Sequence, residues 1–142
     1  MSNQSNCYPS IGFPGNCDEA ITFYKEAMGA EVKVINYFRD VSPDTDTGLD
    51  ETTPPNTVLF SEVLMFGTTF VMTDFEGTAF PDENHHFWIT AIFDSAEEAT
   101  SVFDKLAENG KVIEPLVPQF WASLNGYVND RFGIHWNVLT RG

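Results

Sequence analysis

The sequence contains one pattern twice. Residues 11–24 (IGFPGNCDEAITFY) lead through Gly29 to a β-rich apolar stretch, and residues 91–103 (AIFDSAEEATSVF) lead through Gly110 to another. Each copy predicts a strand, a short acidic turn, an amphipathic helix, a glycine at the helix end and a second strand. Two copies indicate a domain built from paired modules, because stacked solenoids need three or more repeats.

The helix boundaries are predicted by capping residues. Asn16 is expected to cap the first helix, with Glu19 three positions later to complete a capping box, and Gly29 ends that helix. Ser95 and Glu98 repeat the same logic in the second helix. Apolar residues recur at helical spacing in both segments, so each helix is expected to bury one face in the core.

Strands follow each helix, and turn residues separate them. Gly67-Thr68 predicts one hairpin, and Asn125-Gly126 predicts another, because this dipeptide favours a tight hairpin turn. Each module therefore has the order βαβββ, which indicates an α+β fold with modules at about 7–75 and 84–141 of a single domain, 1–142. The predicted strands after the first are 32–38, 58–66, 69–73, 86–93, 111–116, 120–124, 127–129 and 134–140.

Charge and composition restrict the partners. Seven basic residues against 21 acidic residues give a net charge of −14, which argues against binding to nucleic acid or to an anionic membrane. No apolar run has the length of a membrane span, and the first residues do not resemble a leader, so a cytoplasmic protein is expected. The two cysteines, Cys7 and Cys17, are expected to be reduced thiols.

Six segments of the chain carry a resemblance to a known family: 13–24, 29–31, 70–74, 103–110, 120–121 and 126–136. They resemble the vicinal oxygen chelate superfamily, which contains glyoxalases, bleomycin-resistance proteins and extradiol dioxygenases. Within it, the chain is most similar to the PhnB-like branch, often labelled 3-demethylubiquinone-9 3-methyltransferase. The resemblance implies a curved mixed sheet that forms a cup, and a homodimer. Methyltransferase activity is not expected, because no glycine-rich loop follows the first strand.

The resemblance also implies four strand positions for metal ligands. In this chain the four positions carry a proline, a glutamate, a tryptophan and an asparagine. Proline and tryptophan side chains cannot bind a metal, and asparagine is a weak donor, so only the glutamate is a good ligand. This favours an interpretation without a metal. The four positions carry Pro9, Glu62, Trp88 and Asn137 in this chain.

An alternative interpretation retains a metal site with a different set of ligands. A shift of two residues preserves the strand face, and it would bring in His86 and His135 in place of the tryptophan and the asparagine. Together with Glu62 they would form a set of two histidines and one carboxylate, suited to Mn, Fe, Ni or Zn. Without a metal, Glu62 alone is the candidate for acid–base catalysis.

Aromatic residues give the stronger binding signal. Phe120, Trp121 and Trp136 fall near the last predicted hairpin, and Trp88 is expected to face the same cavity. We therefore predict a protein that binds a small planar or cationic ligand in an aromatic-lined cup without a metal. The alternatives are a metal-dependent lyase, isomerase or dioxygenase, and an interaction module without a ligand.

Overall fold

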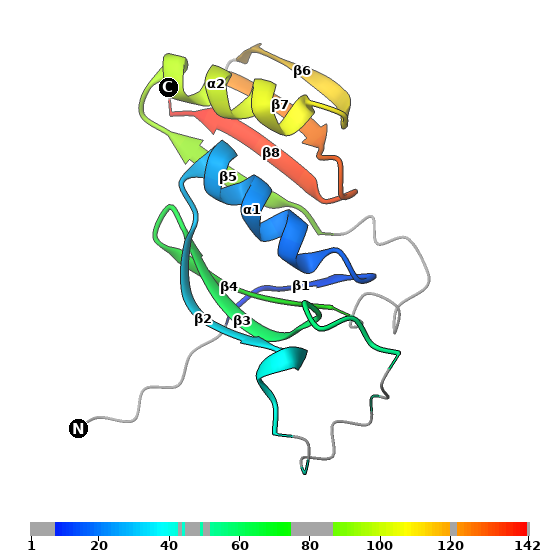
Figure 1. Ribbon diagram of the computed structural model, residues 1–142. Helices are drawn as coiled ribbons and strands as arrows, with labels where there is room; N and C mark the ends of the chain where they lie inside the picture. Colours follow the sequence, from blue (N-terminus) through cyan, green and yellow to red (C-terminus); the bar gives the residue numbers. More distant parts are fainter. Residues whose placement is uncertain are drawn as a thin grey trace, which may run out of the picture. The chain divides into compact units, whose positions relative to one another are not determined.

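The computed structural model describes residues 8–42, 44, 49, 52–74, 87–119 and 122–141. The chain divides into two compact units, Met1–Pro81 and Asp82–Gly142 (Figure 1). We describe each unit by itself. The assignment of both modules to a single domain stays a prediction.

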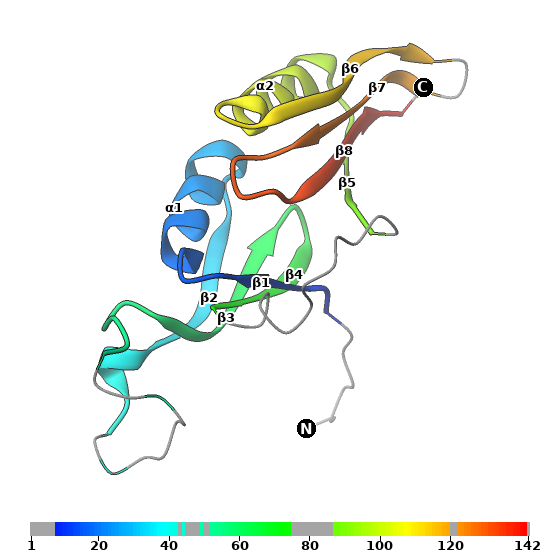
Figure 2. The ribbon, with the colours of Figure 1, turned by 90° about the vertical axis from the view of Figure 1, so that its right-hand side faces the viewer.

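The first unit is a four-stranded mixed sheet with one helix. In this sheet β1 is parallel to β4, whereas the β4–β3 and β3–β2 pairs are antiparallel, and the strand order is β1-β4-β3-β2. The helix α1 lies along one face of the sheet (Figure 2). The elements are β1 (Ser10–Phe13), α1 (Cys17–Met28), β2 (Glu31–Tyr37), a short 3-10 turn (Phe38–Asp40), β3 (Val58–Met65) and β4 (Thr68–Asp74).

The second unit repeats this topology. Here β5 is parallel to β8, the other pairs are antiparallel, and the strand order is β5-β8-β7-β6. The α+β class and the two predicted βαβββ modules are thereby confirmed. The elements are β5 (Ile89–Phe93), α2 (Ala96–Ala107), β6 (Lys111–Gln119), β7 (Ala122–Asn129) and β8 (His135–Thr140).

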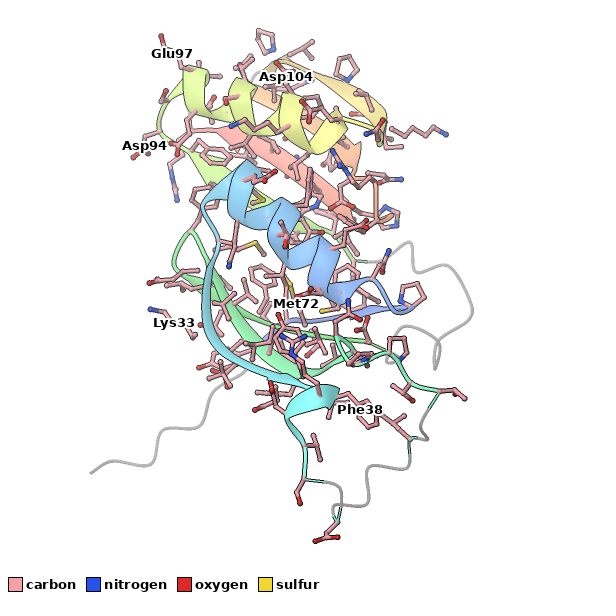
Figure 3. The ribbon with its side chains drawn as sticks, in the orientation of Figure 1. Lys33, Phe38, Met72, Asp94, Glu97 and Asp104 are labelled. Carbon is pink, nitrogen blue, oxygen red and sulfur yellow. The ribbon has the colours of Figure 1, made fainter. Side chains whose placement is uncertain are left out.

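Each core lies between the helix and the facing side of its sheet. Met72 of β4, labelled in Figure 3, is fully buried in the first unit, and Trp136 and Val138 of β8 are buried in the second. Asp104 lies on the exposed side of α2. Burying one large apolar side chain stabilises a fold by roughly 1.5–3 kcal/mol, so these alternating residues set which face each strand turns to its helix. The predicted stripes supply the helical half of both cores: Ala20, Phe23, Tyr24 and Ala27 in α1, and Ala99, Val102, Phe103 and Leu106 in α2.

Of the four predicted helix ends, those at Gly29 and Ser95 are confirmed, and α2 ends at Ala107, three residues before Gly110. The Ser95 hydroxyl accepts a hydrogen bond from the backbone N–H of Glu98 at 3.2 Å, which is the N-cap bond of a capping box. Gly29 adopts a left-handed conformation with φ of 66°, and its N–H donates to the carbonyl of Lys25. Each helix has 12 residues, and no described helix is long and apolar enough to cross a membrane.

The predicted capping of α1 by Asn16 is wrong in its chemistry. Asn16 stands at the N-cap, but its side chain makes no capping hydrogen bond. The buried carboxylate of Asp74 caps the start of α1 instead. Its Oδ1 accepts hydrogen bonds from the backbone N–H groups of Gly15 and Cys17 at 3.0 and 2.9 Å. Its Oδ2 accepts the N–H of Val58 at 2.8 Å. An ionised acceptor makes stronger hydrogen bonds than an amide, so Asp74 ties β4 to the start of α1 and to β3.

The hairpin predicted at Asn125-Gly126 is also wrong, because both residues lie inside β7. Gly126 is required by packing and not by a turn. A Cβ atom there would lie 2.9 Å from Cα of Leu116 and 2.9 Å from Cε2 of Phe103. The predicted strands 120–124 and 127–129 are therefore one strand in the described range Ala122–Asn129, and the β6–β7 connection falls at 120–121, outside the described residues.

Candidate functional site

A hollow of about 550 Å³ lies in the second unit. Its walls come from the segment before β5 and from β6, β7 and β8, so one sheet positions nearly the whole site. Four of the eight lining residues are phenylalanine, tryptophan or tyrosine, and a carboxylate, an amide and an imidazole are among the polar groups. The lining residues are Phe87, Trp88, Ile113, Glu114, Tyr127, Asn129, His135 and Trp136.

Strand alternation brings three of the lining side chains, those of Tyr127, Asn129 and His135, to one face of the sheet. Tyr127 pairs with Asn137 and Asn129 pairs with His135 across β7 and β8, so all four project from one face of the sheet. Val128 and Val138 occupy the opposite, helix-covered face and are fully buried. The ring of Trp88 contacts the ring of Tyr127 edge-on, with centroids 6.1 Å apart and planes at 87°.

The polar edge of the hollow is held by a cross-strand pair. Nδ1 of His135 and Oδ1 of Asn129 are 2.6 Å apart. Both residues flank the β7–β8 turn, which the carboxylate of Asp130 braces. Oδ1 of Asp130 accepts the backbone N–H groups of Phe132 and Ile134 at 2.8 and 3.1 Å. The orientation of the imidazole therefore follows from a turn with little freedom.

The two described tryptophans predicted to bind a ligand have different surroundings. Trp88 is 51% exposed, and its ring is accessible beside Tyr127. Trp136 contributes to the lining of the hollow, but it is only 1% exposed, and its indole N–H donates to Oδ2 of Asp130 at 2.9 Å. A contact between the Trp136 ring and a ligand stays a prediction.

The other predicted site residues lie elsewhere. Phe120, Trp121 and His86 fall outside the described residues. Glu62 is half-buried on β3, where it pairs with Val34 and Val71. It belongs to the first unit, whereas every described residue that lines the hollow belongs to the second. Its predicted catalytic role stays a prediction.

The four positions implied for metal ligands do not fit a resident metal. The indole of Trp88 offers no ligand atom. The amide of Asn137 is a weak ligand, and its Nδ2 donates to Oδ1 of Asn125 at 2.7 Å and to the carbonyl of Gly126 at 3.0 Å. Its Oδ1 accepts from the Thr90 hydroxyl at 3.4 Å.

Metal-ligand clusters are equally missing from the rest of the described chain. Among the residues in the described ranges, no group of three or more His, Cys, Asp or Glu could hold a metal ion. The alternative set of Glu62, His86 and His135 includes one residue outside those ranges and draws on both units. It stays a prediction.

Sequence reasoning missed five of the lining residues: Phe87, Ile113, Glu114, Tyr127 and Asn129. A signal for Tyr127 and Asn129 was present, because residues 125, 127 and 129 occupy every second position of one strand and therefore share one face. The predicted turn at Asn125-Gly126 broke that strand and concealed the shared face. No local signal distinguishes Glu114, since β6 is exposed along nearly its whole length.

Comparisons with known proteins agree with this fold. The family model described as the glyoxalase/bleomycin resistance protein/dioxygenase superfamily matches residues 13–138. Protein YjdN of Escherichia coli (strain K12) is 30% identical over 140 residues, which cover 92% of this chain and 91% of that protein.

Two solved structures extend the comparison. Protein PA1353 from Pseudomonas aeruginosa is 29% identical, with a TM-score of 0.78 and coverage of 97% of this chain and 98% of that one. The PhnB protein from Bacillus cereus, a putative 3-demethylubiquinone-9 3-methyltransferase, is 22% identical, with a TM-score of 0.72 over 96% and 99% of the two chains. The second likeness shows the fold alone. As the sequence predicted, the chain belongs to the glyoxalase/bleomycin resistance protein/dioxygenase superfamily.

Proposed function

We propose that the protein binds a small planar organic ligand in the hollow of its second unit, without a resident metal. One observation carries the proposal. The exposed ring of Trp88 stands edge-on to Tyr127 at the wall of a hollow of about 550 Å³. Ligand sites commonly have this size, with aromatic walls and a few polar groups that orient the ligand.

The polar groups favour a ligand that donates hydrogen bonds or carries positive charge. Glu114 supplies a carboxylate, and His135 and Asn129 supply an imidazole and an amide. Among the described residues that line the hollow, none is lysine or arginine. A net charge of −14 adds a long-range attraction for cations and a repulsion for anionic ligands such as phosphates.

The absence of a resident metal is proposed on the donor chemistry. Trp88 occupies one implied ligand position and serves as an aromatic wall, while Asn137 occupies another and bonds to β5 and β7. Binding through Phe120 and Trp121, catalysis by Glu62, a homodimer and a cytoplasmic location are further expectations from the sequence. The proposal does not depend on them.

A titration with proflavine, a planar cation, tests the proposal. We expect saturable quenching of protein fluorescence by wild-type protein. Trp88→Leu should weaken binding by about fivefold, since loss of a cation–π contact removes about 1 kcal/mol. Val112→Ala is the matched control, because Val112 is an exposed apolar residue of β6 that does not line the hollow.

Two results would overturn the proposal. Ligand binding in the hollow is wrong if proflavine does not bind below about 1 mM, or binds Trp88→Leu as tightly as wild type. Metal independence is tested separately by inductively coupled plasma mass spectrometry on protein purified without a histidine tag. A stoichiometric divalent metal that survives dialysis would contradict it and favour the metal-dependent alternative.

A further inference from the structure

The pair formed by Asn129 and His135 determines which ring nitrogen of the histidine is available. An amide oxygen only accepts hydrogen bonds, so the contact of 2.6 Å between Oδ1 of Asn129 and Nδ1 of His135 requires a proton on Nδ1. In neutral imidazole the other nitrogen, Nε2, is then unprotonated and can only accept. Within the described part of the chain, no side chain bonds to Nε2, and His135 lines the hollow.

The surrounding turn holds this pair in place. Asn129 is the last residue of β7 and His135 the first of β8, and the two face each other across the antiparallel pair. Between them, the N–H of Asp130 donates to the carbonyl of Ile134 at 3.0 Å, and the buried carboxylate of Asp130 binds backbone and indole N–H groups. A functional side chain is oriented well when such a second layer of hydrogen bonds restrains it.

We propose that Asn129 holds neutral His135 in its Nδ1–H tautomer, so that Nε2 accepts a hydrogen bond from an N–H or O–H group of the ligand. The inference rests on the proposed binding function and deepens it. Asn129 is a positioning residue, and His135 is the residue that determines specificity. The ligand class becomes planar molecules with a donor group at the edge, such as aminoaromatic or hydroxyaromatic compounds.

The tautomer can be measured without any ligand. We expect two-bond ¹H–¹⁵N correlation spectra at about pH 8.5, above the usual titration range of histidine, to show His135 with a protonated Nδ1. Its signals are assigned by their loss in His135→Phe, which separates them from those of His85 and His86. Asn129→Asp keeps an acceptor and should retain the tautomer, whereas Asn129→Leu should change it.

A spectrum with the proton on Nε2 would overturn the proposal. It would mean that the amide of Asn129 donates to Nδ1 and that His135 offers a donor to the hollow. This result would leave ligand binding itself unaffected. The tautomer measurement and the binding measurement can therefore fail independently.

The acceptor role is measured with a matched pair of dyes. Proflavine carries two amino groups, and acridine orange is the same planar cation with those groups fully methylated. We expect wild-type protein to prefer proflavine by about fivefold, the worth of one hydrogen bond, and the preference to disappear in His135→Phe. Both cations also carry a ring N–H, so the comparison tests only a hydrogen bond from an amino group. If both dyes bind equally to wild type, the proposed acceptance from an amino group at the ligand edge is wrong while the binding function stands. If neither binds, both are wrong.

Discussion

Removal of the Asp74 carboxylate is the sharpest test of how the first unit is assembled. Asp74 is 2% exposed, and its two oxygens accept N–H groups from the segment before α1, from α1 itself and from β3. In Asp74→Ala, the N–H groups of Gly15, Cys17 and Val58 lose their acceptor. Two of these three contacts are buried and one is partly buried.

The expected loss of stability follows from the number of N–H groups that lose their acceptor. A buried donor left without an acceptor costs about 1–3 kcal/mol, and water entering the vacated space recovers part of it. We therefore expect Asp74→Ala to lower the free energy of unfolding by about 3–5 kcal/mol. Asp74→Asn should cost about 1–3 kcal/mol, because one oxygen remains for Gly15 and Cys17 while an amide NH₂ group faces the N–H of Val58.

Urea denaturation followed by far-ultraviolet circular dichroism measures these differences. Asp104→Ala is the matched control, because it removes the same charge from an exposed position of α2, and it should stay within about 0.5 kcal/mol of wild type. Hydrogen exchange adds a local measurement, since the amide protons of Cys17 and Val58 should exchange faster in Asp74→Ala. If that variant loses no more stability than Asp104→Ala, the capping role is refuted.

Three further predictions concern single residues. Burial raises the pKa of the Cys17 thiol, so in a Cys7→Ser background iodoacetamide at about pH 8 should leave folded protein unmodified and react after unfolding in urea. The pKa of Tyr37 is raised to about 12, mainly by burial and secondly by the 2.6 Å hydrogen bond that its hydroxyl donates to Asp18. The stability gained from neutral Tyr37 is therefore present below about pH 10 and lost as the pH rises to about 12. Asp18→Asn should lower this pKa in a ¹³C NMR titration but leave it above the ordinary value, because burial is the largest cause. Gly126→Ala should destabilise the fold by about 1–3 kcal/mol in urea denaturation, and an unchanged midpoint would contradict the close packing on β6 and α2.

The fold was predictable from the sequence because its determinants are mostly local. Helical and strand periodicity, Gly29 and the Ser95 capping box lie within single elements, and the repeat indicated that both modules share one topology. The cap of α1 was not predictable in this way. Its acceptor, Asp74, is 57 residues from Cys17 in the sequence, and only the parallel pairing of β1 with β4 brings it near.

The site was predictable in part, and strand parity was not a sufficient guide to it. Trp136 and Asn137 are adjacent on β8, so they cannot face the same side of the sheet. The structure places Asn137 with His135 on one face of the sheet and buries the Trp136 ring, whose N–H donates to Asp130. Of these three residues, His135 and Trp136 line the hollow and Asn137 does not, so strand parity alone does not decide which side chains reach it.

Cross-strand pairs along this face also bear on the kind of chemistry that the hollow suits. Asn125 binds Asn137, and Asn129 binds His135, so each polar group on β8 is already oriented by its partner on β7. Side chains restrained in this way lose little further freedom when a ligand binds, which lowers the entropic cost of association. In Asn137 both bonds to β7 are made by Nδ2, which donates to Oδ1 of Asn125 and to the carbonyl of Gly126. This preorganisation supports the proposed recognition of a small organic ligand.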